Sequence, residues 1–312
     1  KKIEIIKIGN FWSYCNRRLV FLICSIKLFI VALKLKDPII FSFQGNFYAI
    51  LISIILKKKI IVRSNLNPQA WSKSFFKSII FQYLLSKANL VIVNSFEFQK
   101  QMTKIFKIKS EVIYNPVNFN QIKKLSHYKK KISFFQEETI NLINVGRLVD
   151  QKNQIQILSA LVKLKKNIKN YRLLIIGYGP NKKNLENFIK KKKINKFVKI
   201  IFVKNPYKYI KMADAFILSS KYEGLPNTLL EAACLNKYII SSNCKSGPKE
   251  ILKEYEFGEL YKEDHTKHLY SILNKLKKNK LLNKKKDYSK NLSSFEAKKN
   301  LAKYLNNINN LL

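Results

Sequence analysis

The sequence predicts an α/β fold built from two doubly wound parallel-sheet domains. Short apolar runs rich in β-branched and aromatic residues, such as "KKIIVRS" and "YRLLIIG", alternate with longer segments whose apolar residues recur at helical spacing. This alternation stops after Asn115-Pro116 in a polar, lysine-rich stretch and resumes at Thr139. The length of 312 residues also fits two domains. Because strands that alternate with helices build parallel sheets, each half of the chain is expected to form one such sheet.

The first domain, together with the linker that follows it, is predicted over residues 1–136. Its helices are expected at Phe47–Leu56, Phe75–Leu85 and Phe96–Phe106, and the chain opens at Lys1 on a run that resembles a strand. Its other strands are the runs "DPIIFSF", "KKIIVRS", "NLVIVNS" and "SEVIYNP". The linker is the lysine-rich segment "VNFNQIKKLSHYKKKISFFQEE".

The second domain is predicted over residues 137–312 and repeats the same theme before it ends in a terminal helix. In chain order we expect the strand "TINLINVG", the helix Asn153–Lys166, the strand "YRLLIIG", the helix Asn181–Lys192, the strand "FVKIIFV", a short helix at Tyr207–Met212, the strand "AFILSS", a helix from Thr228 and the strand "KYIISSN". Doubly wound sheets bind ligands at the carboxyl ends of their strands, so the loops that follow these strands are the candidate sites.

The most apolar run of the chain, Leu19–Leu35, predicts a buried or interface-lying helix. Lys27 interrupts the run, and basic residues flank it on both sides. Its apolar length falls short of the ~20 residues that a bilayer span requires. No cleavable signal sequence is apparent ahead of it.

The chain is strongly basic, with 60 Lys and Arg against 19 Asp and Glu and a formal net charge of +41. An anionic membrane surface and a simple excess of solvated lysines account for this charge equally well. Nucleic acid is the least favoured partner, because aromatic residues do not alternate with the basic runs and no recognition motif is visible. The four cysteines show neither CxxC spacing nor the density of a disulfide framework, which favours reduced thiols in the cytoplasm and no zinc site.

Glycine placement points to a ligand crevice in the second domain. The chain has only eight glycines, and five of them fall at or just after predicted strands of this half: Gly146, Gly177, Gly179, Gly224 and Gly247. Any one of them alone would be read as an ordinary turn glycine, but together they indicate close approach of the backbone to a ligand. The Gly177-Tyr178-Gly179 turn lacks the third glycine of a dinucleotide fingerprint, and no GxxxxGK[ST] loop is present.

Charged residues near these glycines suit a nucleotide sugar. Arg147 and Lys152 lie in the loop "GRLVDQKNQ" ahead of a helix, where two cations and helix amides can hold a diphosphate without a metal. Glu231 matches the last position of a capping box that starts at Thr228. Glu223 lies in the turn before that helix and has no comparable structural role. Because carboxylates accept hydrogen bonds from hydroxyls, both acids suit a ribose and a sugar.

The segments "NVGRLVDQKNQ", "IIGYGP", "MADAFILSSKYEGLPNTLLEA" and "SSNCKSGPKEIL" closely resemble the carboxyl-terminal domain of the retaining GT-B glycosyltransferases of family four. The resemblance includes the E-x7-E pattern formed by Glu223 and Glu231, spans Asn144–Leu252 and is highly specific. The first half resembles the same family more loosely. Within the family the chain is most similar to enzymes that build lipid-linked oligosaccharides and surface polysaccharides. The GT-B fold implies two Rossmann-like domains that face a cleft.

The resemblance also implies roles for individual residues. The catalytic residues would be Glu223, which holds the donor sugar, with Arg147 and Lys152 on the donor diphosphate. The donor-binding residues would be Glu231, Gly146, Gly177, Gly179, Val203, Gly224, Leu225, Pro226, Asn227 and Thr228, with Glu231 on the ribose hydroxyls. On the acceptor side the resemblance suggests Gln44, Asn46 and Arg63, with Gln44 in the place where many members keep a histidine. Neither a metal nor another cofactor is expected.

The expected function is transfer of a sugar from a nucleoside-diphosphate donor, a UDP-sugar, to a lipid-linked or polysaccharide acceptor with retention of configuration. The chain would act at the cytoplasmic face of a membrane as a peripheral protein. Two related alternatives remain open. One is a GT-B nucleotide-sugar epimerase. The other is an inactive relative, because the resemblance leads us to expect a truncated first domain without the family's first βα unit. A basic nucleic-acid-binding protein is the alternative from another class.

Overall fold

A computed structural model of the chain describes residues 17–43, 46–65, 68, 74–127, 132–252, 258–277 and 292–312. The chain forms two compact units, the first made of residues 1–113 and 303–312 and the second of residues 114–302. The strand expected at Lys1 lies outside the described residues. In each unit the described strands form one parallel sheet, as the alternation of strands and helices predicts.

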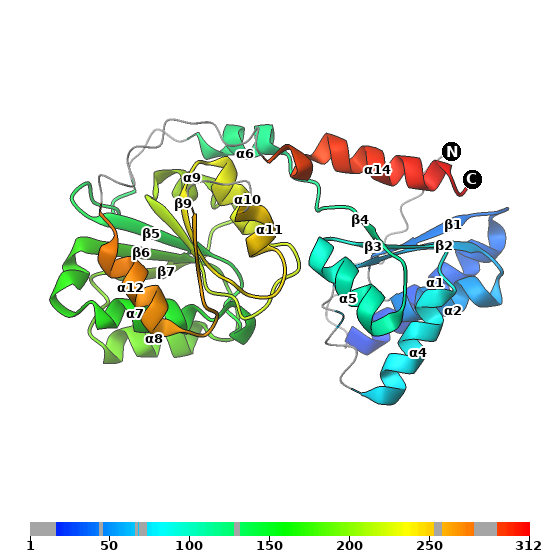
Figure 1. Cartoon of the computed structure of the whole chain (residues 1–312), viewed down its shortest axis with the longest axis horizontal. Helices are drawn as coiled ribbons and strands as arrows, with labels where there is room; N and C mark the ends of the chain where they lie inside the picture. The colour runs from blue at the N-terminus through cyan, green and yellow to red at the C-terminus, as the bar shows by residue number, and fades with distance from the viewer. Residues whose placement is uncertain are drawn as a thin grey trace. The chain divides into compact units, whose positions relative to one another are not determined.

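Within the described residues, the sheet of the first unit has four parallel strands in chain order, β1 (Ile39–Ser42), β2 (Lys59–Ser64), β3 (Leu90–Val93) and β4 (Glu111–Val112). Right-handed connections that advance in one direction place their helices on one face of a sheet. Figure 1 shows α1 (Arg17–Lys34), α2 (Asn46–Ile55), α4 (Phe75–Ser86) and α5 (Phe96–Phe106) together on one side of these strands. The described strands of this unit therefore contain no reversal of strand order.

The opposite face of the first sheet packs against the end of the chain. Tyr304, on helix α14 (Ala297–Asn309), joins Ile61, Ile92 and Ile113 in one hydrophobic cluster. Lys59 Nζ donates a hydrogen bond of 2.5 Å to the carbonyl oxygen of Leu311. The prediction that the terminal helix belongs wholly with the second domain is therefore wrong, since the last ten residues pack with the first unit.

The sheet of the second unit is doubly wound, as predicted. Its described part has six parallel strands, β5 (Ile140–Val145), β6 (Tyr171–Ile176), β7 (Val198–Ile201), β8 (Ala215–Leu218), β9 (Tyr238–Ser242) and β10 (Gly258–Tyr261), in the order β10-β9-β8-β5-β6-β7. The order reverses between β5 and β8, which pair directly in the register Leu142↔Ala215. This reversal is the topological switch point of the sheet.

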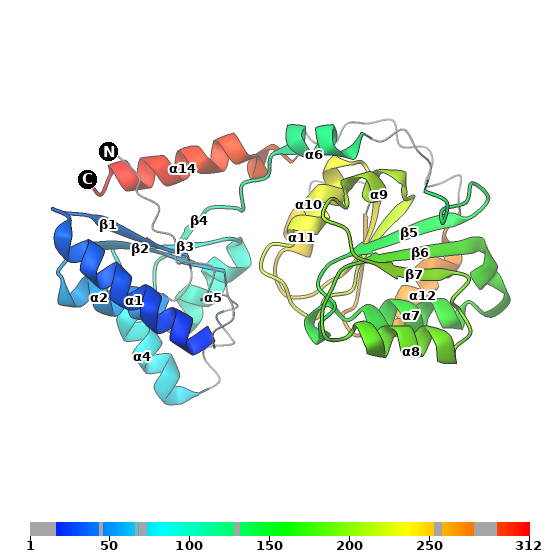
Figure 2. The ribbon, with the colours of Figure 1, turned by 180° about the vertical axis from the view of Figure 1, so that it is seen from behind.

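Helices cover both faces of the second sheet (Figures 1 and 2). One face carries α7 (Gln154–Lys163), α8 (Lys182–Lys191) and α12 (Thr266–Lys275). The other carries α6 (Phe119–Ser126), α9 (Tyr207–Met212), α10 (Asn227–Cys234) and α11 (Pro248–Leu252). Short 3-10 turns occur at η2 (Asp150–Lys152), η3 (Lys165–Asn170) and η4 (Ser293–Phe295). The core beneath α7, α8 and α12 is one cluster of buried side chains, mostly Leu and Ile, from the strands and from these helices.

The second unit begins at Tyr114, so the predicted boundary after residue 136 is displaced. Val117 forms an isolated parallel bridge with Glu296, with Val117 N donating to Phe295 O at 3.0 Å and Ala297 N donating to Val117 O at 2.9 Å. In the predicted linker, α6 buries Phe119 and Ile122. Its lysines lie on the remaining face, which explains why the composition of the segment resembles a linker.

The run Leu19–Leu35 forms a helix, as expected, in α1. Only Ala32 among its described side chains is fully buried, and several apolar side chains lie exposed. Across the described parts of the chain, no helix combines the length and the hydropathy that a membrane span requires.

Candidate functional site

The switch point of the second sheet brings several of the predicted residues together. Loops that leave neighbouring strands in opposite directions open a crevice there, which is where such sheets bind ligands. Gly146 and Arg147 follow β5, and Lys152 ends the turn η2. Ser219, Ser220 and Glu223 follow β8. Residues that are far apart in the sequence meet here because β5 and β8 are neighbours.

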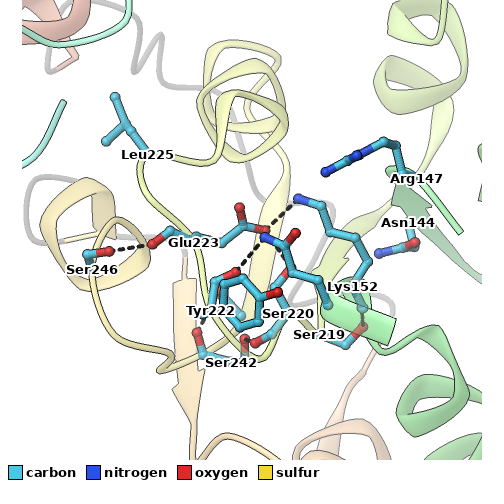
Figure 3. Close-up of polar contacts among 12 residues, drawn as sticks. Asn144, Arg147, Lys152, Ser219, Ser220, Tyr222, Glu223, Leu225, Ser242 and Ser246 are labelled. Carbon is cyan, nitrogen blue, oxygen red and sulfur yellow. Dashed lines mark hydrogen bonds and ion pairs between the residues drawn. The ribbon is translucent and has the colours of Figure 1, made fainter. Parts of the chain in front are cut away.

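The centre of the site is a buried ion pair between Lys152 and Glu223 (Figure 3). Lys152 Nζ lies 2.5 Å from Glu223 Oε1, and the two side chains are only 15% and 8% exposed. Ser220 Oγ donates a second hydrogen bond of 2.5 Å to the same carboxylate oxygen. The carboxylate for which the sequence shows no structural role therefore has two partners, and the pair keeps both charges compensated in a place that water barely reaches.

Hydrogen bonds between the two loops hold this pair in place. Ser219 Oγ donates to Lys152 O at 2.7 Å, and Gln151 Nε2 donates to Tyr222 O at 2.9 Å. Lys221 N donates to Gln151 O at 2.8 Å. On the other side, Ser246 Oγ donates to the backbone oxygen of Glu223 and Ser242 Oγ donates to that of Ser220. The loops after β5, β8 and β9 thus form one connected polar framework (Figure 3).

Arg147 adds a positive group on the solvent side of the pair. Its side chain is exposed, and Figure 3 shows it extending toward the ammonium group of Lys152. Gln154 Nε2 fixes its backbone by donating to Arg147 O at 2.9 Å. Within the described residues Arg147 takes part in no ion pair. A guanidinium group in this position can make bidentate hydrogen bonds to phosphate oxygens.

The glycines at the strand ends have a packing role. A Cβ atom on Gly177 would lie 1.9 Å from the carbonyl oxygen of Gly146, and one on Gly179 would lie 2.4 Å from that of Leu148. The loops after β5 and β6 approach this closely because Leu148 N donates to Tyr178 O at 2.8 Å. A Cβ on Gly146 would make only ordinary contacts, at 3.7 Å from the Lys152 side chain. Glycine at positions 177 and 179 therefore allows the loops after β5 and β6 to pack this closely beside the site.

The turn from Gly224 to Thr228 leads into α10, and here the predicted capping box is wrong. The helix begins at Asn227 with Pro226 as its N-cap, so Thr228 lies inside the first turn and no side chain caps the helix. The buried Thr228 Oγ1 has no hydrogen-bond partner in the described part of the chain. Leu225 and Pro226 are buried, and Asn115 Nδ2 donates to Asn227 Oδ1 at 2.6 Å. Because Thr228 forms no cap, its hydroxyl does not compete with an anion for the first amides of α10.

Glu231, one turn further along α10, has an unusual environment. Burial raises the pKa of its carboxyl to about 7, although the hydrogen bond from Tyr207 acts in the opposite direction. Burial also raises the pKa of the Tyr207 hydroxyl to about 12, and the neighbouring Glu231 contributes to this shift. Sequence reasoning missed Tyr207 as a partner, because it lies on the short helix α9, far from Glu231 in the chain.

An exposed aromatic pair lies at the ends of β6 and β7, where Gly177, Gly179 and Val203 were predicted to flank a base. The rings of Tyr178 and Phe202 stand 5.2 Å apart between centroids at an interplanar angle of 84°. Both side chains are exposed, and the neighbouring Val203 is half-buried. Sequence reasoning missed Phe202, although an aromatic residue directly after a strand and opposite Tyr178 could have indicated it.

The acceptor-side predictions fall in the first unit. Asn46 joins two strand ends there, accepting a hydrogen bond from Ser42 Oγ at 2.8 Å and donating to Arg63 O at 3.0 Å. Arg63 is buried, with its guanidinium 5.8 Å from the Phe43 ring and 5.6 Å from the Tyr304 ring, and burial lowers its pKa. These contacts give Arg63 a packing role in this unit. Gln44 lies outside the described residues.

No group of three or more His, Cys, Asp and Glu side chains is arranged to hold a metal ion within the described ranges. The expectation that no metal or cofactor takes part stays a prediction.

Two Rossmann-like parallel-sheet units, one with a cluster of charged and polar side chains at its switch point, are the arrangement expected of GT-B glycosyltransferases. The sequence agrees with this class: residues 127–294, more than half of the chain, match the family described as glycosyl transferases group 1, and the chain belongs to that family.

Curated relatives are similar over most of this chain. An N-acetylgalactosamine-N,N'-diacetylbacillosaminyl-diphospho-undecaprenol 4-alpha-N-acetylgalactosaminyltransferase of Campylobacter jejuni is 27% identical over 305 residues, which cover 92% of this chain and 81% of the relative. An uncharacterized glycosyltransferase of Methanocaldococcus jannaschii is 29% identical over 245 residues, or 72% of this chain. The chain spans about 60% of the length of that archaeal protein.

Solved structures show the same fold. The crystal structure of Anabaena HepE in complex with UDP superposes with a TM-score of 0.76 and covers 92% of this chain and 82% of its own, at 16% sequence identity. At this identity the likeness concerns the fold. The fold prediction is thus confirmed, whereas the roles of individual residues stay predictions.

Proposed function

We propose that this protein transfers a sugar from a UDP-sugar to an acceptor carried on a lipid diphosphate or a polysaccharide, with retention of configuration. The observation that carries the proposal is the Lys152–Glu223–Ser220 cluster with Arg147 beside it, at the switch point of the second sheet. Cations for a diphosphate and a carboxylate for sugar hydroxyls lie within one crevice. The Campylobacter relative acts on an undecaprenol-linked acceptor, and the HepE structure contains UDP, which supports this donor and acceptor class.

In this proposal each residue has one task. Arg147 and Lys152 neutralise the negative charge that grows on the diphosphate as the bond between the sugar and the phosphate oxygen breaks. The acceptor oxygen forms the new bond to the sugar, and its proton passes to a diphosphate oxygen. Glu223 accepts hydrogen bonds from the donor sugar, and Glu231 accepts them from the ribose. Because two cations supply the positive charge, the reaction needs no metal.

Other parts of the second unit complete the donor site in this proposal. The first-turn amides of α10, from Asn227 and Thr228, bind phosphate oxygens, and the buried Leu225 and Pro226 just before them hold them in position. The aromatic pair of Tyr178 and Phe202 stands against the base. The acceptor and its lipid would place the enzyme peripherally on the inner face of a membrane.

Titration calorimetry with UDP, together with transfer of labelled sugar to membrane lipid, tests the proposal. We expect Arg147→Ala and Lys152→Ala to lose most UDP affinity and transfer, while Lys183→Ala, which changes an exposed lysine on α8, retains both. Transfer that is unchanged in either site variant would remove the diphosphate assignment. Release of a free epimerised sugar without any acceptor would identify the epimerase instead.

A further inference from the structure

The first unit has an apolar outer surface on two adjacent helices. Phe75 and Phe76 of α4 are 74% and 76% exposed, and Ile79, Ile80 and Tyr83 continue the same exposed stripe along the helix. The opposite side of α4 buries Phe81, Leu84 and Leu85 against the unit. An ordinary surface helix is polar on its outer side, so a helix that is apolar on both sides has a second apolar environment to contact.

Helix α2 extends this apolar surface. It packs directly against α4 (Figure 1), and Phe47, Leu51, Ile54 and Ile55 are exposed on it. We call the exposed apolar residues of α2 and α4 the outer helical face. The two helices touch, and they connect β1 to β2 and β2 to β3, so they lie over the middle of the described sheet rather than at its edge.

The charges on the two helices themselves, and on the chain between them, have one sign. The sequence contains no Asp or Glu from Pro38 to Phe96, a stretch that includes both helices. Three exposed lysines accompany the helices: Lys57 follows α2, Lys77 lies within α4 and Lys87 follows α4. Lys87 Nζ lies 5.1 Å from the centroid of the Tyr83 ring, so its charge sits at the border of the apolar residues.

We propose that the outer helical face inserts into the interfacial region of an anionic lipid bilayer. Exposed apolar side chains and lysines, on helices that carry no acid, match a surface whose interior is hydrocarbon and whose headgroups are negative. A helix of 12 residues is about 18 Å long, which suits a helix that lies in the interface and is too short to cross the bilayer. The inference deepens the proposed function, because a lipid-linked acceptor is found at such a surface.

Vesicle sedimentation of the full chain tests this binding. The probes are vesicles of phosphatidylcholine alone and of phosphatidylcholine mixed with phosphatidylglycerol, at low salt and at about 1 M salt, where charges are screened within about 3 Å. We expect sedimentation with the anionic vesicles at low salt and much less in the other conditions. Equal binding to neutral and anionic vesicles, or none to either, would overturn the proposal.

Paired variants locate the surface. Phe75→Ser with Phe76→Ser should lower the partition coefficient onto the anionic vesicles more than about tenfold. Lys77→Glu with Lys87→Glu should lower the same coefficient about fivefold or more for each lysine. The matched controls lie in the second unit: Ile155→Ser for exposed apolar area, and Lys183→Glu with Lys190→Glu for charge. Both controls should bind like the unaltered chain. Wild-type binding in the two outer-face variants would refute the assignment.

Two further measurements distinguish lipid binding from self-association and from donor binding. Sedimentation velocity reports whether the outer helical face joins two copies of the chain; a dimer that Phe75→Ser with Phe76→Ser converts to monomers would overturn the lipid assignment. UDP titration separates this inference from the proposed function, because the outer-face variants should retain UDP affinity and thermal stability. An unaltered chain that binds vesicles but not UDP would leave this inference standing and remove the donor assignment.

Discussion

The buried ion pair gives a sharp prediction about stability. Lys152→Met keeps most of the side-chain volume but leaves the Glu223 carboxylate, 8% exposed, with Ser220 as its remaining partner. Removing one member of a buried pair costs about 3–5 kcal/mol because the other charge stays buried. Glu223→Gln should cost about 1.5–3 kcal/mol, the usual value of a charge-assisted hydrogen bond. The double variant leaves no unpaired charge and should be less destabilised than the sum of the two, with a coupling energy of about 2 kcal/mol.

Thermal unfolding followed by calorimetry measures this cycle. For a unit of this size a loss of 1 kcal/mol lowers the midpoint by about 2–4 °C. A cost of about 3–5 kcal/mol for Lys152→Met should therefore lower the midpoint of the second unit's transition by about 6–20 °C. Lys163→Met, on α7 and outside the site, is the matched control. A coupling energy below about 0.5 kcal/mol would show that the two side chains do not form the pair described, and the site geometry would then be wrong.

Three further predictions concern single residues. Glu223→Gln should strengthen binding of UDP alone several-fold, as measured by calorimetry, because it releases the Lys152 ammonium. The same change should lower sugar transfer about tenfold to a hundredfold in a transfer assay. Gly177→Ala should destabilise the second unit by at least about 3 kcal/mol, as seen in urea unfolding, because its Cβ would lie 1.9 Å from Gly146 O. The pKa of Glu231 is raised from 4.5 to about 7, so between these values the folded state keeps a proton that the unfolded state releases. The free energy of unfolding should therefore fall by about 3 kcal/mol as the pH rises from about 4.5 to 7. Glu231→Gln should remove this fall.

Each of these has an outcome that would contradict it. Weaker UDP binding in Glu223→Gln would mean that the carboxylate supports the diphosphate site rather than competing for Lys152. A Gly177→Ala protein of normal stability would show that the two loops are not in close contact. A pH profile that is the same with and without the Glu231 carboxyl would place that group in water, with an ordinary pKa.

Local periodicity predicted most elements of the fold because it reports which residues must be buried. The helix Phe96–Phe106 was expected at the bounds that α5 has, since its buried residues recur at helical spacing. The strand β10 (Gly258–Tyr261) and the helix α12 (Thr266–Lys275) were not expected. β10 is a short edge strand in which only Tyr261 is fully buried, so it lacks the apolar run that reveals an interior strand.

Local composition predicted the wrong domain boundary for a related reason. The segment from Tyr114 to His127 is rich in polar residues, yet Val117 pairs with the backbone near Phe295 and α6 buries two apolar residues. A contact with a segment almost 180 positions away in the chain leaves no trace in local composition. Only the partner segment shows that these residues belong to the second unit.

At the candidate site, too, local sequence predicted the individual residues but not the contact between them. Residue types and spacing selected Lys152 and Glu223 separately, as a cation before one helix and an acid before another. Their contact spans 71 positions and depends on the reversal of strand order that makes β5 and β8 neighbours. In a sheet that kept its strands in chain order, as the described strands of the first unit do, the loops after β5 and β8 would be separated by two intervening strands. The switch point is therefore what turns two ordinary loops into one crevice, and a charge pair held there can serve a ligand that enters between the loops.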